Sequence, residues 1–418
     1  MNLASYIRRA WLVSFAGYCL CLTFAIAYSH VLVGIALVFL FFDMLLSADL
    51  RLSPSEKRLY LLIGIYVTWE IFSALVNDSP ARSLWTLKEE WLFLFVPLAL
   101  RAMLRERWRE RFLFALALST IVLGLYGWLQ HFFFLNLRPD FALGIMPDGL
   151  ARASGAFHNT LTYGNLFALL SVVFVTLALY TRANGIRWLY AAAGIIAGGA
   201  TVFSYSRGPI VALTVGLALA AALSFRISRQ LALGFLALIV ISGALLAPNL
   251  VDRFRAALNP DESKQTLRDK AVSRITIWST TVEIITEHPL FGVGPGNFYD
   301  AYKKKAPDLS VHFSHAHNDA LNIAAYAGVP AAALYLCIWG YLLYLFSRET
   351  FRRRPGDPGA AVLAASLAGI VVFFVASQTE AAFSDEEVRS FLMVLWGFGL
   401  WALDTGSGRF SGPTSQAQ

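Results

Sequence analysis

The feature that most constrains the fold is a series of long apolar runs, most of them separated by short segments that contain arginine. These runs predict transmembrane spans at residues 10–29, 31–47, 59–76, 91–104, 112–134, 160–180, 188–204, 209–225, 230–248, 321–346, 360–377 and 388–403. Only 15% of the residues are charged, which is too few to cover the surface of a soluble protein. The pattern therefore predicts an all-α polytopic membrane protein with about 12 transmembrane helices and one large helical external loop. It excludes an ordinary cytosolic enzyme, a disordered protein and a nucleic-acid-binding module.

The distribution of basic residues predicts the orientation of the chain. An even number of spans places both termini on the same side of the membrane. The segments assigned to that side carry 19 Lys and Arg residues, whereas the short loops opposite carry six. Because basic residues accumulate in short cytoplasmic loops, both termini are predicted to be cytoplasmic. The same rule explains the formal net charge of +7 without a nucleic-acid partner.

The predicted spans divide the chain into three parts. Residues 1–248 hold transmembrane helices one to nine, residues 249–320 form the external loop lobe, and residues 321–418 hold helices ten to twelve and a cytoplasmic tail. All seven histidines fall on or near the external face. Histidine is the side chain best suited to proton transfer near neutral pH, so this asymmetry indicates that chemistry takes place outside.

The strongest candidate site is the segment from Ser314 to Leu321, where the external loop enters the tenth predicted span. Asn318 or Asp319 is suited to be the N-cap of that helix. His317 would then stand at the positive end of the helix, which keeps the ring neutral and able to accept a proton. The same end attracts phosphate oxygens, so it suits a base beside an anionic substrate. The alternative is that these residues only cap a membrane helix at the interface.

A metal site is a second interpretation of this segment. Residues 315–319 fit the H-x-H-x-D pattern of binuclear metal hydrolases, whose ligands usually follow a strand. Here the pattern precedes a membrane helix, so metal binding by His312, His315 and His317 is the weaker interpretation. We therefore predict neither a metal site nor a cofactor.

Three arginines at the external face are candidates for binding an anionic substrate. Arg207 lies in a tight turn before Pro209, Arg274 opens a helical run of the loop, and Arg152 precedes the sixth span. Arginine binds phosphate in a bidentate way and keeps its charge. The alternatives are a snorkelling side chain for Arg207 and solvated charges for the other two. The turn around Gly294 could present backbone N–H groups to an anion, or could be only a turn.

Together these segments resemble the O-antigen ligase and polymerase superfamily. The residues that carry the resemblance are Ser206-Arg207-Gly208, Arg274, Trp278, the run from His288 to Phe298, His317-Asn318-Asp319 and Leu321. The resemblance is most specific over residues 200–330, and the layout of spans with one large loop extends it over the chain.

The resemblance implies a glycosyltransferase of the bacterial inner membrane whose external loop is periplasmic. It would transfer O-antigen polysaccharide from undecaprenyl pyrophosphate to lipid A–core oligosaccharide, independently of metal and nucleotide. Direct attack on the anomeric carbon would invert its configuration. The functional arginines and histidine of the family correspond to three catalytic residues here, Arg207, Arg274 and His317. We assign four further residues to substrate binding: Arg152, His315, Asn318 and Gly294.

Two other functions stay open. An O-antigen polymerase of the same superfamily would lengthen the donor glycan instead of transferring it to lipid A–core. A secondary transporter with twelve spans belongs to a different class, but its two halves often look alike and its polar residues often lie at the midplane. Here the two halves look unlike and the polar features gather at one face. The ligase is the favoured interpretation.

Overall fold

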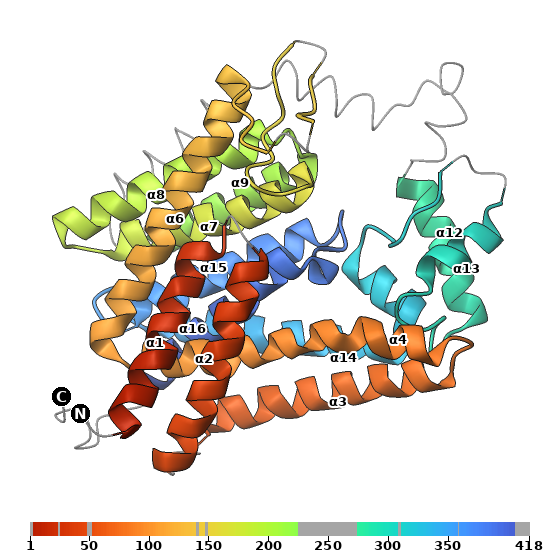
Figure 1. Cartoon of the computed structure of the whole chain (residues 1–418), viewed down its shortest axis with the longest axis horizontal. Helices are drawn as coiled ribbons and strands as arrows, with labels where there is room; N and C mark the ends of the chain where they lie inside the picture. The colour runs from red at the N-terminus through yellow and green to blue at the C-terminus, as the bar shows by residue number, and fades with distance from the viewer. Residues whose placement is uncertain are drawn as a thin grey trace.

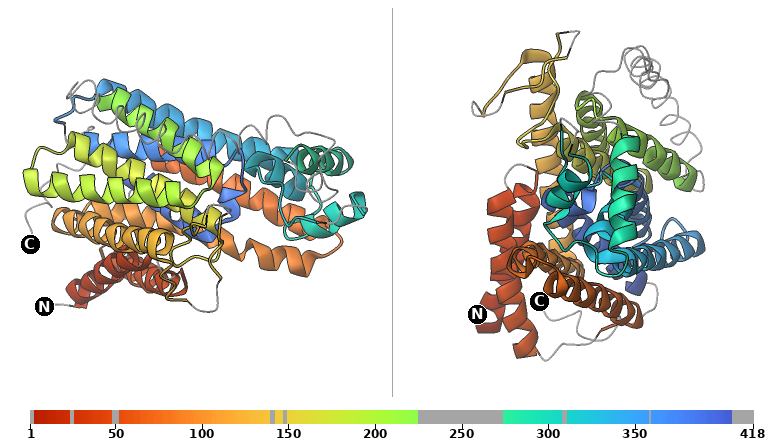
Figure 2. Two further views of the ribbon diagram at one scale, coloured as in Figure 1. Left: turned by 90° about the horizontal axis from the view of Figure 1, so that it is seen from above. Right: turned by 90° about the vertical axis from the view of Figure 1, so that its right-hand side faces the viewer.

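A computed structural model describes residues 3–23, 26–47, 52–138, 142–146, 149–224, 274–307, 311–357 and 359–405. Within these ranges the secondary structure is helical, apart from one isolated β-bridge between Ile145 and Ala151. The helices are α1 (Leu3–Cys21), α2 (Ile26–Ser47), α3 (Pro54–Val76), α4 (Pro80–Thr86), η1 (Leu87–Leu94), α5 (Phe95–Met103), α6 (Glu106–Phe133), α7 (Thr160–Tyr180), α8 (Asn184–Phe203), α9 (Arg207–Ser224), α12 (Arg274–Glu287), α13 (Phe298–Lys305), α14 (Asp319–Arg352), α15 (Ala360–Ala376), η2 (Ala382–Ser384) and α16 (Glu386–Thr405). The short helices α12 and α13 lie together at one end of the bundle of long helices (Figures 1 and 2).

Seven of the described helices are long and apolar enough to cross a membrane, judged by length and composition: α2, α3, α6, α7, α8, α9 and α14. The apolar helix α15 is shorter, with 17 residues. The described part of the chain therefore has the architecture of an all-α polytopic membrane protein, as the apolar runs predicted. The total of twelve spans stays a prediction, because the ninth, at residues 230–248, lies outside the described residues.

Two helix boundaries differ from those predicted. Helix α1 ends at Cys21 and α2 begins at Ile26, inside the predicted span 10–29. Only Thr23 interrupts the apolar run there, so hydropathy does not mark the turn. The predicted span 91–104 is the last part of a bent segment that runs through α4, η1 and α5. Pro97 has no N–H to donate to the carbonyl of Phe93, so a regular α-helix cannot continue through this point.

Helix α7 forms the centre of the bundle. Every residue from Tyr163 to Leu179 is buried, and α7 packs against α8, α9 and α15. Helices in a membrane approach closely where small residues line the contact. A Cβ atom at Gly194 of α8 would lie 2.7 Å from the side chain of Val175, and one at Gly216 of α9 would lie 2.8 Å from Val172. These glycines let α8 and α9 approach α7, which fixes the start of α9 relative to the rest of the bundle.

Helix α14 is divided by a kink at Gly328, where φ is 87° and Pro330 follows. The backbone groups near the kink find partners in other elements. The indole N–H of Trp69 in α3 donates to the carbonyl of Ala327 at 3.0 Å. The turn of residues 288–297 donates two backbone hydrogen bonds to carbonyl groups just before the kink. The first half of α14 is therefore anchored to both α3 and the turn that follows α12.

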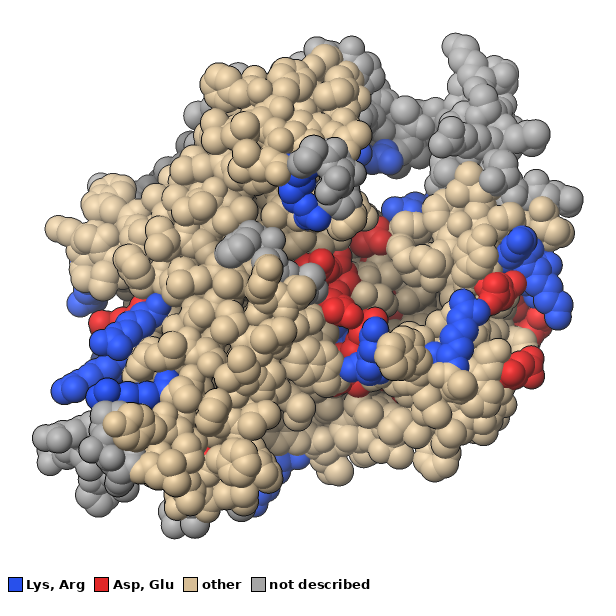
Figure 3. Space-filling view, viewed as in Figure 1, with Lys and Arg blue, Asp and Glu red and all other residues tan. Residues whose placement is uncertain are grey.

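The described ends of the chain meet at the end of the bundle opposite to α12 and α13. Asp43 of α2 pairs with Arg8 of α1 and lies 4.0 Å from Arg105, just before α6. Arg109 of α6 lies over the ring of Trp401 in α16. The start of α1 and the end of α16 therefore lie on one side, as an even number of spans requires. Figure 3 shows basic side chains gathered at this end.

Candidate active site

The loop between α13 and α14 holds the segment that the sequence analysis singled out. Its last residue, Asn318, caps α14, because its side-chain oxygen accepts a hydrogen bond from the N–H of Leu321 at 3.0 Å. His317, just before the cap, has φ of 51°, a left-handed conformation that costs a non-glycine residue roughly 1–2 kcal/mol. The indole of Trp278 in α12 holds this loop by donating to the carbonyl of Ala316 at 3.1 Å. Strained residues that their surroundings hold in place are typical of functional sites.

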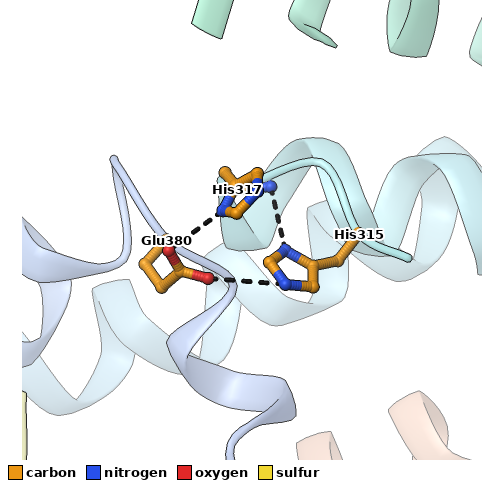
Figure 4. Close-up of side chains that lie close together, drawn as sticks. All are labelled: His315, His317 and Glu380. Carbon is orange, nitrogen blue, oxygen red and sulfur yellow. Dashed lines mark hydrogen bonds and ion pairs between the residues drawn. The ribbon is translucent and has the colours of Figure 1, made fainter. Parts of the chain in front are cut away.

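One carboxylate, that of Glu380, joins two histidines of this loop (Figure 4). Nδ1 of His317 lies 3.0 Å from Oε2 of Glu380, and Nε2 of His315 lies 3.5 Å from Oε1. Nη2 of Arg274, the first residue of α12, is 3.7 Å from Oε2. We call these four residues the Glu380 cluster. It combines side chains from the loop before α14, from α12 and from the segment between α15 and α16.

The position of Glu380 is set by the start of α14. Asp319, the first residue of α14, donates from its N–H to the carbonyl of Ser377 at 3.0 Å. Its carboxylate accepts a hydrogen bond from the N–H of Phe383, also at 3.0 Å. These two bonds attach both sides of the segment that carries Glu380 to the helix that begins two residues after His317. The contact between Glu380 and His317 is thus fixed by local backbone bonds.

The charges in the Glu380 cluster determine which imidazole nitrogens carry protons. Burial disfavours the ionised carboxylate of Glu380, but the hydrogen bond from His317 and the charges of His317, His315 and Arg274 outweigh this effect and lower the pKa of Glu380. An ionised carboxylate can only accept hydrogen bonds, so Nδ1 of His317 donates to it. The N–H of His317 donates to Nδ1 of His315 at 3.3 Å, so a neutral His315 carries its proton on Nε2. Burial lowers the pKa of His315 to about 4, which keeps this ring neutral at pH 7.

The remaining nitrogen of His317 is the basic atom that the cluster leaves open. Nε2 of His317 is buried and has no hydrogen-bond partner among the described residues. By contrast, both nitrogens of His315 and both carboxylate oxygens of Glu380 have partners within the cluster. A buried polar atom without a partner costs about 1–3 kcal/mol, and a hydroxyl group of a ligand would remove that cost. The arrangement can therefore accept a proton from a hydroxyl.

Arg207 lies at the start of α9, next to the segment that carries Glu380. A Cβ atom at Gly208 would overlap with Oγ1 of Thr379, so the start of α9 touches the residue just before Glu380. Burial lowers the pKa of Arg274, the charge of Glu380 opposes this change, and the charge of Arg207 adds to it. The two guanidinium groups therefore lie close enough to interact. Two arginines that stay charged beside a basic nitrogen are suited to bind phosphate groups.

Arg152 supports the turn that precedes Arg207. Its Nε donates to the carbonyl of Ser204 at 3.0 Å, and its Nη2 donates to Oγ of Ser206 at 3.3 Å. Tyr205, between these two serines, has φ of 52° and is therefore strained. Sequence analysis predicted that Arg152 binds substrate, but its guanidinium is engaged with the turn. These two hydrogen bonds hold the strained turn in place, and substrate binding by Arg152 stays a prediction.

The turn around Gly294 is occupied by contacts with α14. Gly294 has φ of 90°, and its N–H donates to the carbonyl of Tyr326 at 2.8 Å. Sequence analysis suggested that this turn presents backbone N–H groups to an anion. The N–H of Gly294 is instead bonded to α14. The left-handed conformation favours glycine here, and a Cβ atom would overlap with the side chain of Asn77, which follows α3. The other two residues assigned to substrate binding, His315 and Asn318, lie in the cluster or directly beside it.

Three members of the cluster could in principle bind one metal ion. The ligand atoms of His315, His317 and Glu380 lie within 4.8 Å of one another. Two observations favour a hydrogen-bonded acid–base pair instead. The 3.0 Å separation of Nδ1 and Oε2 is that of a hydrogen bond, and the guanidinium of Arg274 lies 3.7 Å from the same oxygen, where its charge would repel a cation. His312, the third histidine of the weaker metal interpretation, hydrogen-bonds the carbonyl of Ala306 instead.

Acidic side chains gather in a hollow between the bundle and the α12–α13 end of the molecule (Figure 3). Several acidic residues at this end of the helices have partners within the chain. Arg389 makes two hydrogen bonds to Glu90, of 2.9 and 2.5 Å, and Thr162 donates to Asp385 at 2.6 Å. These contacts join α16 to η1, and the residue just before α16 to α7.

Glu380 is the site residue that sequence analysis missed. It stands four residues after α15 ends, in a short connection to α16. A carboxylate just past an apolar span, on the face where the histidines gather, is the signal that could have marked it. Its partner His317 is 63 positions away, however, and no spacing pattern connects the two.

Part of the chain matches a known protein family. Residues 192–336 match the family model described as O-Antigen ligase. The matched region runs from α8 into α14 and contains Arg207, Arg274 and His317, whereas Glu380 lies beyond it. No curated protein matches the chain.

Proposed function

The chain belongs to the O-antigen ligase and polymerase superfamily, and we propose that it is an O-antigen ligase. It moves O-antigen polysaccharide from undecaprenyl pyrophosphate to lipid A–core oligosaccharide and so completes lipopolysaccharide. The observation that carries this proposal is the pair of His317 and Glu380 next to two arginines, at one end of a bundle of membrane helices. Glycosyl transfer from a pyrophosphate needs a base for the acceptor hydroxyl and positive charge for the leaving group.

In the proposed reaction, the acceptor hydroxyl gives its proton to Nε2 of His317 while its oxygen attacks the anomeric carbon of the donor sugar. The bond between that carbon and the pyrophosphate oxygen breaks, and undecaprenyl pyrophosphate leaves with the bonding electrons. Arg207 and Arg274 stabilise the negative charge on the pyrophosphate. Attack and departure take place on opposite faces of one carbon, so the anomeric configuration is inverted. The proton then passes from His317 to solvent.

The proposed reaction requires neither nucleotide nor metal. The pyrophosphate linkage of the donor is already activated, so no nucleotide has to be cleaved. The two guanidinium groups supply the charge that a metal ion would otherwise provide at the leaving group. The partners in the reaction are therefore the lipid-linked donor, lipid A–core oligosaccharide and the surrounding membrane lipids.

We place the protein in the bacterial inner membrane with both termini in the cytoplasm and the Glu380 cluster on the periplasmic side. The basic side chains at the far end of the bundle support this orientation, because cytoplasmic ends of membrane helices carry an excess of Lys and Arg. The donor and the acceptor are both anchored in lipid, so they reach a site at the ends of membrane helices by moving within the bilayer.

Reconstitution tests the proposal. Purified full-length protein would be mixed with undecaprenyl-pyrophosphate-linked O-antigen and rough lipopolysaccharide in the presence of a chelator. We expect ligation by the wild type, loss of ligation in His317→Ala, and normal ligation in His312→Ala, a matched histidine of the same loop outside the cluster. Donor chains that lengthen while the acceptor stays bare would identify a polymerase. If neither substrate changes, a transporter would become the better explanation.

A further inference from the structure

We infer that Glu380 is a positioning residue for His317: its carboxylate holds a proton on Nδ1 and leaves Nε2 as the atom that accepts the proton of the acceptor sugar. The inference rests on the function proposed above, since it assigns the atom that performs the proton transfer. Neither the family match, which ends at residue 336, nor the sequence pattern includes Glu380. The argument rests on the geometry of the cluster.

The contact between His317 and Glu380 is short and shielded from solvent. Nδ1 and Oε2 are 3.0 Å apart, and the two side chains are only 13% and 12% exposed. A hydrogen bond to a charged group is stronger in such surroundings than in water. An imidazole whose Nδ1 donates to a carboxylate presents its lone pair at Nε2 when neutral. The carboxylate therefore selects both the tautomer and the orientation of the ring.

His315 cannot take the role of the base in this arrangement. Its Nδ1 accepts the backbone N–H of His317 at 3.3 Å, and its Nε2 faces Oε1 of Glu380 at 3.5 Å. A neutral ring with one nitrogen accepting and the other donating has no lone pair left for a substrate. His315 instead occupies the second carboxylate oxygen and limits how Glu380 can rotate. The two histidines thus hold opposite tautomers around one carboxylate.

Glu380 also prepares the site for the charge that appears during transfer. When Nε2 receives the proton, His317 becomes an imidazolium, and the adjacent carboxylate stabilises it. Arg274 lies 3.7 Å from the same oxygen and keeps that carboxylate ionised. In serine proteases, the carboxylate that orients the catalytic histidine is worth about 10⁴ in kcat. Loss of the charge at position 380 should therefore lower kcat far more than it changes KM.

The kinetic experiment compares Glu380→Gln with Glu283→Gln in the reconstituted full-length protein. Glu283 is an exposed carboxylate of α12 and serves as the matched control. We expect kcat to fall by roughly 100-fold in Glu380→Gln, with KM changed by less than about threefold, and no change in the control. In the double variant with His317→Ala, removal of Glu380 should cause no further loss, because Glu380 acts through His317. Losses that multiply in the double variant would overturn the inference.

The pH profile of kcat separates positioning from a merely structural role. The charged or titratable groups around His317 are His315 in its own loop and Glu380 after α15. Glu380 in turn interacts with Arg274 of α12 and Asp319 of α14, and Arg207 of α9 interacts with Arg274. In Glu380→Gln the imidazolium loses its carboxylate partner, so the acidic limb of the profile should move to lower pH. An unchanged profile with a uniformly lower rate would indicate only structural damage and would contradict the inference.

Nitrogen-15 NMR of histidine-labelled wild type tests the tautomer without any activity measurement. The His317 signals would be assigned by their loss in His317→Asn, and we expect protonation at Nδ1 and not at Nε2. The opposite tautomer, or a shift of the signals on titration with Zn²⁺ that marks a metal site, would overturn the inference. Failure of the proposed function gives a different pattern, in which the expected tautomer is present but the wild type transfers no glycan.

Discussion

Gly208 packs so closely against Thr379 that a Cβ atom at position 208 would overlap with Oγ1 of the threonine. Gly208 follows Arg207, and Thr379 precedes Glu380. The contact therefore sets the spacing between the arginine at the start of α9 and the carboxylate that holds His317. Overpacking at this point should separate the phosphate-binding side of the site from the proton-accepting side.

We predict that Gly208→Ala lowers the rate of glycan transfer by roughly 10- to 100-fold, because a misplacement of about 1 Å in a catalytic site can cost 10²-fold. The loss of stability should be about 1–3 kcal/mol or less, since Thr379 is exposed and can yield. Transfer rates and thermal unfolding of the reconstituted protein would be measured together.

Two further variants test whether the contact with Thr379 causes the loss of transfer in Gly208→Ala. Thr379→Ala in the Gly208→Ala background removes Oγ1 and leaves the Cβ of residue 379 at 3.6 Å, an ordinary contact, so transfer should recover. Gly64→Ala is the matched control, because no atom lies within 4 Å of a Cβ at that glycine. If the double variant is as slow as Gly208→Ala, the contact with Thr379 is not the cause.

The strained backbone of His317 predicts that activity and stability respond differently to substitution. With φ of 51°, this position tolerates asparagine well and β-branched residues poorly. His317→Asn should abolish the base, lowering transfer by about 10²- to 10⁴-fold, while the thermal midpoint stays near that of the wild type. His317→Val should lose the same activity and also about 1–2 kcal/mol of stability. Equal midpoints for the two variants would show that the left-handed conformation is not maintained in solution.

Substitutions of Arg152 and of Arg207 should have different effects on the thermal midpoint and on the rate of glycan transfer. Arg152 donates to Ser204 and Ser206 and so supports the turn, whereas Arg207 follows the turn with an exposed side chain. We predict that Arg152→Lys, which cannot reproduce the forked donor geometry, lowers the thermal midpoint by the equivalent of about 1–2 kcal/mol. Arg207→Lys should leave the midpoint within measurement error and reduce kcat by at least about tenfold.

One outcome would contradict the assignment of Arg152 to the support of the turn. A stable Arg152→Lys protein with a raised KM for the lipid-linked donor would restore Arg152 to substrate binding. Arg182→Lys, an exposed arginine between α7 and α8, serves as a control for exchanging one cation for another.

The helices could be predicted from the sequence because hydropathy is a local property, but the cluster could not. His317 and the N-cap Asn318 were predictable, since a polar residue before an apolar run is a local signal. Glu380 was not predictable, because it reaches His317 only where Asp319 attaches the segment after α15 to the start of α14. Such pairings arise from tertiary packing and leave no periodicity in the chain.

The roles of the arginines and glycines were also hard to predict from the sequence. Charge alone did not distinguish Arg152 from Arg207, because the partners of Arg152 include a backbone carbonyl, which any residue possesses. Likewise the glycine turn looked suited to an anion, but its N–H groups bond α14 where Gly328 breaks the helix. In both cases the hydrogen-bond partners depend on tertiary packing, so the sequence could not predict them.

The Glu380 cluster predicts a loss of stability at acidic pH. The pKa of Glu380 is lower in the folded protein than its ordinary value, so its contribution to stability is present at neutral pH and is lost as the pH falls through the folded value. Burial lowers the pKa of His315 from 6.5 to about 4, so the unfolded chain binds more protons in that window. His315 therefore makes the folded state less stable as the pH is lowered from 6.5 to 4, and Glu380 adds a further loss below its ordinary pKa of 4.5.

His315→Gln should flatten this decline, because it removes one of the two groups while keeping a side chain that can donate to Glu380. Thermal midpoints of wild type and variant would be measured in the same detergent at pH 7, 6, 5 and 4. We expect the midpoint of the wild type to fall more steeply than that of the variant between pH 6.5 and 4, a difference worth about 1 kcal/mol or more across the window. His288→Gln, at an exposed histidine after α12, should follow the wild type. Parallel curves for wild type and His315→Gln would mean that His315 is not buried as a neutral ring beside Glu380.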